Sequence, residues 1–238
     1  MGHPTTRRGL SHEVRRAQPA RALAGQKLAT MAARFPDIGL TLSSIIQAVT
    51  LGVWASVVAS QYSRLTLTQW LVAIAMFVFI VNVWHHILIE VLSYEYVPGF
   101  VDTLLFFGTG GIELFMVYTM SLNFVVWLAG MTISSGAPLV AVLIVRNKAI
   151  REGVNAEILA VTEPLLNWRL GYSGFAVIVS GICLFFAALD KLNYSDSGVR
   201  AAVSAVIAGA IIVLFAGYSL LLTLYWRSTV RALRTAAQ

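Results

Sequence analysis

The stretch Leu67–Ser93, LTQWLVAIAMFVFIVNVWHHILIEVLS, decides the fold class of this chain. It exceeds the roughly 20 predominantly apolar residues that an α-helix needs to cross a hydrocarbon core of about 30 Å. Its first half holds no ionisable side chain, whereas its second half holds His85, His86 and Glu90. The stretch therefore predicts a transmembrane helix with polar groups near its end.

Five other stretches are apolar over a comparable length. They are Asp37–Ser60, Phe100–Met120, Leu122–Val145, Leu170–Leu189 and Val199–Trp226. The whole chain is 58% hydrophobic and 12% charged, which is about half the charge of a soluble domain. The sequence thus predicts an all-α integral membrane protein, a bundle of six transmembrane helices.

The predicted domain organisation follows from these stretches. Residues 1–36 form a basic cytoplasmic arm, which includes an amphipathic helix or is a solvated tail or a docking segment. Residues 37–228 form the transmembrane domain, with a cytoplasmic insertion at 146–169, where 154–168 suit a helix along the membrane surface. Residues 229–238 are a short basic tail.

The positive charges predict the orientation. Of the 17 Lys and Arg residues, only Arg64, Lys191 and Arg200 fall in predicted outer loops. Because basic residues of short loops accumulate on the cytoplasmic side, both termini are expected there, as in a multi-pass protein of a bacterial plasma (inner) membrane. The net charge of +6 then indicates contact with anionic lipids on the cytoplasmic side rather than nucleic-acid binding.

Motifs for catalysis or cofactor binding are not found. The sequence has no phosphate-binding loop, no dinucleotide-binding glycine pattern, no HExxH motif and no nucleophile with a matching base. The single cysteine, Cys183, excludes a disulfide within the chain. We therefore expect neither an enzyme nor a bound cofactor.

Ionisable residues of three predicted helices fall at one level near the cytoplasmic face. Asn82, His86 and Glu90 are four residues apart and share one helix face. The predicted interhelical polar network comprises Asp37, Asn82, His85, His86, Glu90 and Asp102. Two interpretations remain open: tethering of helix ends, and an ion or proton pathway. His86 and Glu90 could also share a metal ion, but two ligands need others to complete the site.

Glu113 lies deeper, roughly 21 Å along its predicted helix from Gly99. A carboxyl at that depth acts as a protonated donor, lines a pore or contacts another helix. The preceding glycines, Gly108, Gly110 and Gly111, indicate close packing against a neighbouring backbone. Glu113 is therefore the second candidate functional position.

Two short motifs resemble a known family. Arg34-Phe35-Pro36-Asp37 opens the first predicted helix, and Trp84-His85-His86 lies near the inner end of the second. Together with six spans, they are similar to the prokaryotic relatives of the endolysosomal potassium channel. The resemblance implies a tetramer whose first helices line a pore, with Ile45 or Ile46 nearest to an apolar constriction. It also implies that Asp37 and one of the two histidines tie the helices together.

Two functions are thus expected. One is a pathway for a monovalent cation or proton, in a homo-oligomer. The alternative is a non-catalytic accessory or scaffolding subunit of a larger membrane complex, which packs against partner helices and lipid or pigment. The basic arm and the many aromatic residues favour the alternative.

Overall fold

The computed structural model describes residues 37–93, 100–151, 156–194 and 196–236. Their regular structure is entirely helical. The helices are the first helix Asp37–Arg64, whose last turn is the 3-10 helix η1 (Tyr62–Arg64), α2 (Leu67–Ser93), α3 (Phe100–Thr119), α4 (Phe124–Arg151), α5 (Ala156–Leu189) and α6 (Val199–Ala236). Each predicted apolar stretch is thus helical, which confirms the all-α class.

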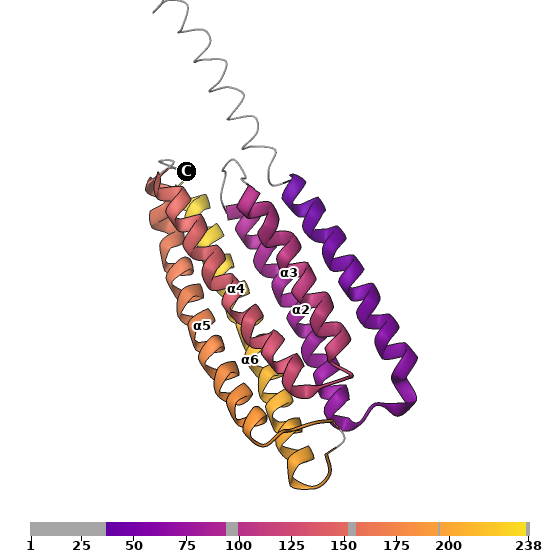
Figure 1. Ribbon diagram of the computed structural model, residues 1–238. Coiled ribbons are helices and arrows are strands. Elements are labelled where there is room, and N and C mark those ends of the chain that lie inside the picture. The colour runs from indigo at the N-terminus through magenta and orange to yellow at the C-terminus, as the bar shows by residue number, and fades with distance from the viewer. Residues whose placement is uncertain (1–36, 94–99, 152–155, 195, 237–238) are drawn as a thin grey trace, which may run out of the picture.

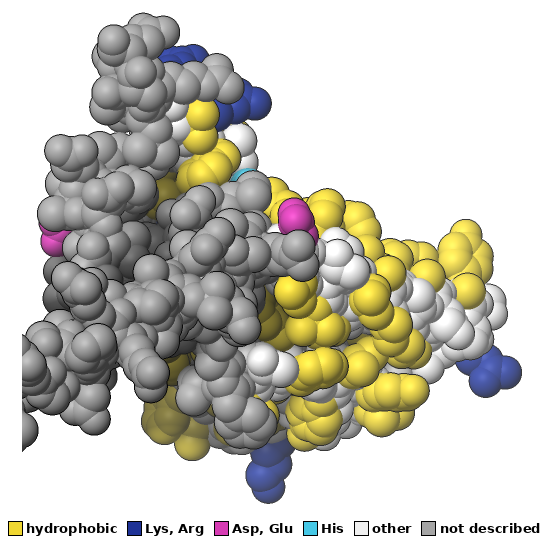
Figure 2. All heavy atoms as spheres, turned by 90° about the horizontal axis from the view of Figure 1, so that it is seen from above, with side chains coloured by type: hydrophobic (Ala, Val, Ile, Leu, Met, Phe, Trp, Pro, Cys, Tyr) yellow, Lys and Arg dark blue, Asp and Glu magenta, His cyan; other side chains and the backbone are white. Residues whose placement is uncertain are grey.

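The helices have the dimensions of membrane spans. Within the described ranges, five helices are long and apolar enough to cross a membrane, and the apolar part of α3, Thr103–Thr119, is shorter. On the face seen in Figure 2, hydrophobic side chains cover much of the described surface, and Lys and Arg side chains project at its margins. An apolar exterior of this kind suits lipid rather than water.

Successive helices run in opposite directions along one bundle (Figure 1). Helix α2 packs mainly on α6, α4 packs mainly on α5, and α3 packs on α4. The first helix lies at the edge: 17% of its most apolar segment is buried, compared with 56% for α2. The start of the first helix and the end of α6 lie at the same end of the bundle (Figure 1).

Two apolar clusters form the interior. The larger cluster includes Met76, Phe79, Trp127 and Phe215, and it joins α2, α3, α4 and α6. The smaller cluster consists of Ile89, Leu165, Tyr218 and Leu222, with Trp168, Tyr172 and Trp226 packed against it. The polar residues of α2 and α6 lie between these clusters, as the next subsection describes.

Helix α5 departs from the prediction. The residues expected to form a separate helix along the membrane surface instead belong to α5, which continues through Pro164. A proline inside a helix removes one backbone hydrogen bond and costs about 3 kcal/mol. Leu165, Leu166 and Arg169, immediately after it, are buried, so packing on this face offsets that cost. Residues 152–155 of the predicted insertion lie outside the described residues.

Candidate functional site

Helix α2 carries two buried polar side chains one turn apart. Asn82 is 4% exposed and His86 is 5% exposed, so these two residues of the predicted shared face are buried. The Asn82 side-chain amide donates to the carbonyl of Phe215 at 3.4 Å and accepts a hydrogen bond from the Ser219 hydroxyl at 2.8 Å. Both partners lie on α6. Asn82 therefore fixes the register of the closely packed pair α2 and α6.

His86 is held between two other helices. Its Nδ1 lies 2.8 Å from the Tyr218 hydroxyl of α6, and its Nε2 contacts the Arg169 guanidinium of α5. A guanidinium has only donors, so Nε2 must accept from Arg169. The ring proton is then on Nδ1, and Nδ1 donates to the Tyr218 oxygen. The imidazole in this structure is neutral, in its Nδ1–H tautomer.

Stacked aromatic rings cover this centre. The Trp168 ring lies parallel to the Tyr218 ring, with 5.3 Å between the ring centroids and 9° between the planes. The Tyr172 ring, one turn after Trp168 on α5, also packs on Tyr218, with 4.5 Å between the ring centroids, and its hydroxyl donates to the carbonyl of Leu214. The Tyr225 ring extends the stack at 5.0 Å from Trp168. These rings limit the rotation of the Tyr218 side chain, whose hydroxyl oxygen accepts the hydrogen bond from Nδ1–H of His86.

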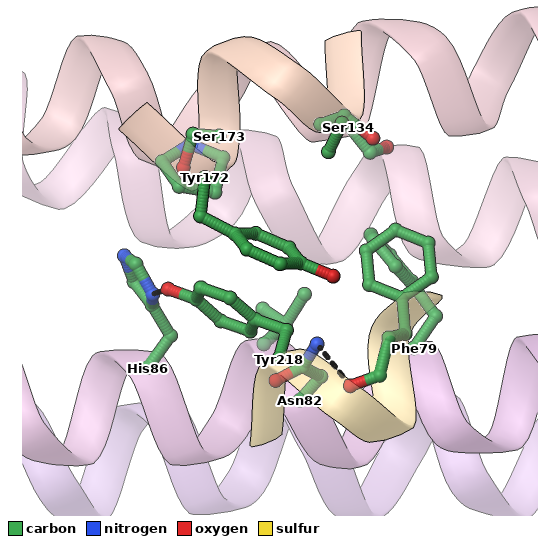
Figure 3. A pocket seen from close by; sticks show the side chains of 12 residues that line it. Phe79, Asn82, His86, Ser134, Tyr172, Ser173 and Tyr218 are labelled. Atoms are coloured by element: carbon green, nitrogen blue, oxygen red, sulfur yellow. Dashed lines mark hydrogen bonds between the residues drawn. The ribbon is translucent and has the colours of Figure 1, made fainter. Parts of the chain in front are cut away.

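A small cavity lies beside His86, between α2, α4, α5 and α6 (Figure 3). Its volume of about 30 Å³ is enough for one or two water molecules. Pro138 lines it and has no N–H, so the carbonyl of Ser134 loses its usual intrahelical donor at this point. The polar side chains that line the cavity are Asn82, His86, Ser134, Ser135, Tyr172, Ser173 and Tyr218. Most of the surface that faces the cavity is nevertheless apolar, and the cavity is too small for a bulky ligand.

A second buried polar group lies on the other side of the bundle. The Glu113 carboxyl of α3 is 0% exposed, and the Gln47 amide of the first helix donates to both of its oxygens, at 3.2 and 3.0 Å. Glu113 thus contacts a neighbouring helix in this structure. Gln47 lies roughly 15 Å along the first helix from Asp37, so the pair lies well inside the bundle.

Gly110, three residues before Glu113, permits this contact. A Cβ atom on Gly110 would lie 2.4 Å from Cγ2 of Ile46, so only glycine allows the first helix to approach so closely. Ile46 thus packs against α3, whereas Ile45 is 58% exposed. Of the two residues named for an apolar constriction, only Ile45 lies on the outer face of this chain.

The other predicted network residues are not all brought together. Asp37 is exposed at the start of the first helix, and His85 is half-buried on a different face from His86. The side chains of Glu90 and Asp102 lie outside the described residues. Among the described part of the chain, no group of three or more His, Cys, Asp and Glu residues could hold a metal ion.

The sequence reasoning missed the partners of His86. Arg169 was assigned to a cytoplasmic loop, yet it is 1% exposed inside the bundle. Tyr172 and Tyr218 were not singled out. The spacing of Trp168, Tyr172 and Phe175, by four and then three residues, is that of one helix face. It indicates that the span beginning at Leu170 extends back into the predicted loop.

Comparisons with known proteins add no relative. No protein-family model, no curated protein and no solved structure matches this chain.

Proposed function

We propose that this chain provides a pathway for protons or other monovalent cations across a membrane, with His86 as one of its polar steps. The observation that carries the proposal is a neutral imidazole that contacts a tyrosine hydroxyl and a guanidinium beside a water-sized cavity. Polar groups in a membrane bundle are energetically costly, and they usually mark pathways or interhelical contacts. Ser or Thr would suffice for a contact, whereas an imidazole can in addition accept a proton on one ring nitrogen and release one from the other.

The size of the cavity favours the proton at this point. About 30 Å³ admits one or two waters but not a hydrated metal ion. A proton that arrives on such a water can pass to Nε2 of the imidazole once Arg169 releases this nitrogen. Nδ1 can then pass its proton to the Tyr218 oxygen while the Tyr218 hydroxyl releases its own proton to another water. Arg169 thus acts as the group that must move for each transfer. We further propose six spans with both termini on the cytoplasmic side, since the positive charges favour that orientation.

Proton flux into liposomes tests this function. The purified full-length protein is reconstituted with an entrapped pH-sensitive dye, and a potassium diffusion potential drives proton entry. We expect wild-type flux above that of empty liposomes. Tyr218→Phe keeps the ring stack and His86→Gln keeps a hydrogen-bonding side chain, and each should lower the flux at least about tenfold, because a positioned proton-transfer group contributes at least that much.

The control is Phe185→Leu, a change at a lipid-facing ring that is 60% exposed. It should leave the flux unchanged. Normal flux in both His86→Gln and Tyr218→Phe, with all proteins inserted equally, would contradict the proposal.

A second candidate function is that of an accessory subunit in a larger membrane complex. The observation that favours it is the first helix, which is attached to the bundle on one side and mostly exposed on the other. An accessory subunit would be silent in liposomes and would co-purify with unrelated membrane proteins. A purified chain that conducts alone excludes this candidate.

A further inference from the structure

Some buried side-chain oxygens between the first helix and α3 take part in no hydrogen bond among the described residues. Ser43, Gln47, Thr50 and Glu113 are each at most 4% exposed, and all but Glu113 lie on one face of the first helix. The Thr50 hydroxyl donates to the carbonyl of Ile46 and also interacts with the Glu113 carboxyl. These four residues are the Glu113 cluster.

Two buried oxygens of the Glu113 cluster have no hydrogen-bond partner within the described structure. They are the side-chain carbonyl oxygen of Gln47, Oε1, and the hydroxyl oxygen of Ser43. The Gln47 head group lies directly against the carboxyl, since its Nε2 is 3.0 and 3.2 Å from the two carboxyl oxygens. Buried polar atoms are nearly always satisfied, so an orphan beside a carboxyl indicates a missing ligand.

The chemistry of the cluster defines that ligand. It offers a single ionisable carboxyl and otherwise neutral oxygens, deep in a membrane-spanning bundle. A net charge there is costly, so the carboxyl requires one compensating positive charge. A divalent ion would leave a charge of the opposite sign. Hard oxygen ligands suit a proton or an alkali-metal ion rather than a soft metal.

We infer that the Glu113 cluster is a binding site for one monovalent cation, either a proton or a dehydrated alkali-metal ion. A proton binds directly on a Glu113 oxygen, and the protonated oxygen can donate to the Thr50 oxygen, or to the Gln47 oxygen once the Gln47 amide turns over. An alkali-metal ion requires the Gln47 amide to turn over, so that Oε1 faces the carboxyl. The site goes beyond the proposed role of His86, because it can bind a cation whether or not the protein conducts.

Reaction with dicyclohexylcarbodiimide tests this inference on the full-length protein in detergent. A protonated carboxyl adds to the carbodiimide, and the resulting O-acylisourea rearranges to a stable N-acylurea without a leaving group. We expect a peptide containing Glu113 to gain the mass of one carbodiimide, and Glu113→Gln to abolish that label. Labelling should slow as the pH rises.

Salts distinguish the two cations. If an alkali-metal ion binds, NaCl, KCl or LiCl at fixed pH should slow the labelling, whereas choline chloride at equal ionic strength should not. If only a proton binds, the three salts and choline chloride behave alike and only pH matters. Either result supports the site.

Variants of the first helix test the ligands. Gln47→Leu, which retains bulk without the amide, should change the pH or salt concentration of half-maximal labelling by about tenfold in cation concentration. Ser56→Ala, on the exposed side of the same helix, should not change it. Glu113 that stays unlabelled in folded wild-type protein at every pH, or labelling that responds to neither pH nor salt, would overturn the inference. Neither readout depends on flux, so a failure of the proposed conduction is seen separately.

Discussion

Single residues of this bundle show what burial of a polar atom costs. Tyr194, in the loop between α5 and α6, is 7% exposed, and its ring packs edge-on against Phe124 with 5.7 Å between the centroids. Its hydroxyl has no hydrogen-bond partner among the described residues. A buried hydroxyl without a partner loses its water contacts and gains nothing in return.

Tyr194→Phe should consequently stabilise the protein. Removing the orphan hydroxyl while keeping the ring should raise the free energy of unfolding by about 1 kcal/mol or more. The measurement is the thermal unfolding midpoint in detergent. Tyr62→Phe, at a ring that is 67% exposed, is the control and should change nothing. A lower midpoint for Tyr194→Phe would show that the hydroxyl has a partner.

The same residue predicts a dependence on pH. Burial raises the pKa of the Tyr194 hydroxyl above its ordinary value of about 10. Because the pKa of Tyr194 is higher in the folded protein than in the unfolded chain, the hydroxyl affects the free energy of unfolding equally at every pH below about 10. Above about pH 10 the unfolded chain ionises first, so the free energy of unfolding falls. The advantage of Tyr194→Phe should therefore grow above about pH 10.

A few close contacts between helices decide how they pack, and the contact at Gly110 leaves the least room for a Cβ atom among the described glycines. The first helix is joined to the bundle by the Gln47–Glu113 pair, by the Trp54 indole that donates to the carbonyl of Ala73, and by the contact of Ile46 with Gly110. Helices separated by so little space depend on residues without a side chain. A methyl group at Gly110 would push the first helix away from α3.

Gly110→Ala should destabilise the protein by about 1–3 kcal/mol, as expected for overpacking. Gly111→Ala is the matched control, because a Cβ atom at Gly111 meets nothing within 4 Å and alanine favours the helix. Ile46→Ala in the Gly110→Ala background should recover part of the loss. Equal unfolding midpoints for Gly110→Ala and Gly111→Ala would contradict the close contact.

The sequence predicts where the helices lie along the chain better than it predicts which residues of different helices contact each other. Hydrophobic length and turn residues locate α2 and α6 at their first residues, because insertion in lipid depends on local composition. The position of Arg169 could not be predicted in the same way. A basic residue after a proline is typical of a loop, and only the packing of α5 on α4 and α6 brings the guanidinium to His86 of α2.

The whole molecule raises the question of what covers the first helix. The residues on its outer face include a series spaced by four: Ser44, Ala48, Gly52, Ser56 and Ser60, all exposed. The first helix also exposes large apolar side chains, such as Ile38 and Val49. Small residues at this spacing are typical of helix–helix contacts in membranes. In the homo-oligomer expected from the sequence, the small residues of neighbouring first helices would meet.

Gly52→Leu tests that arrangement, because a leucine would separate helices that meet at the glycine. If the chain forms an oligomer through its first helices, the variant should be mainly monomeric by native mass spectrometry in conditions where the wild type is oligomeric. Ala210→Leu, at an exposed position of α6, introduces the same bulk on another face and should leave the oligomer intact. A monomeric wild type, or an oligomer that survives Gly52→Leu but not Ala210→Leu, would exclude a pore lined by the first helices. The His86 pathway, which lies within one chain, does not require the oligomer.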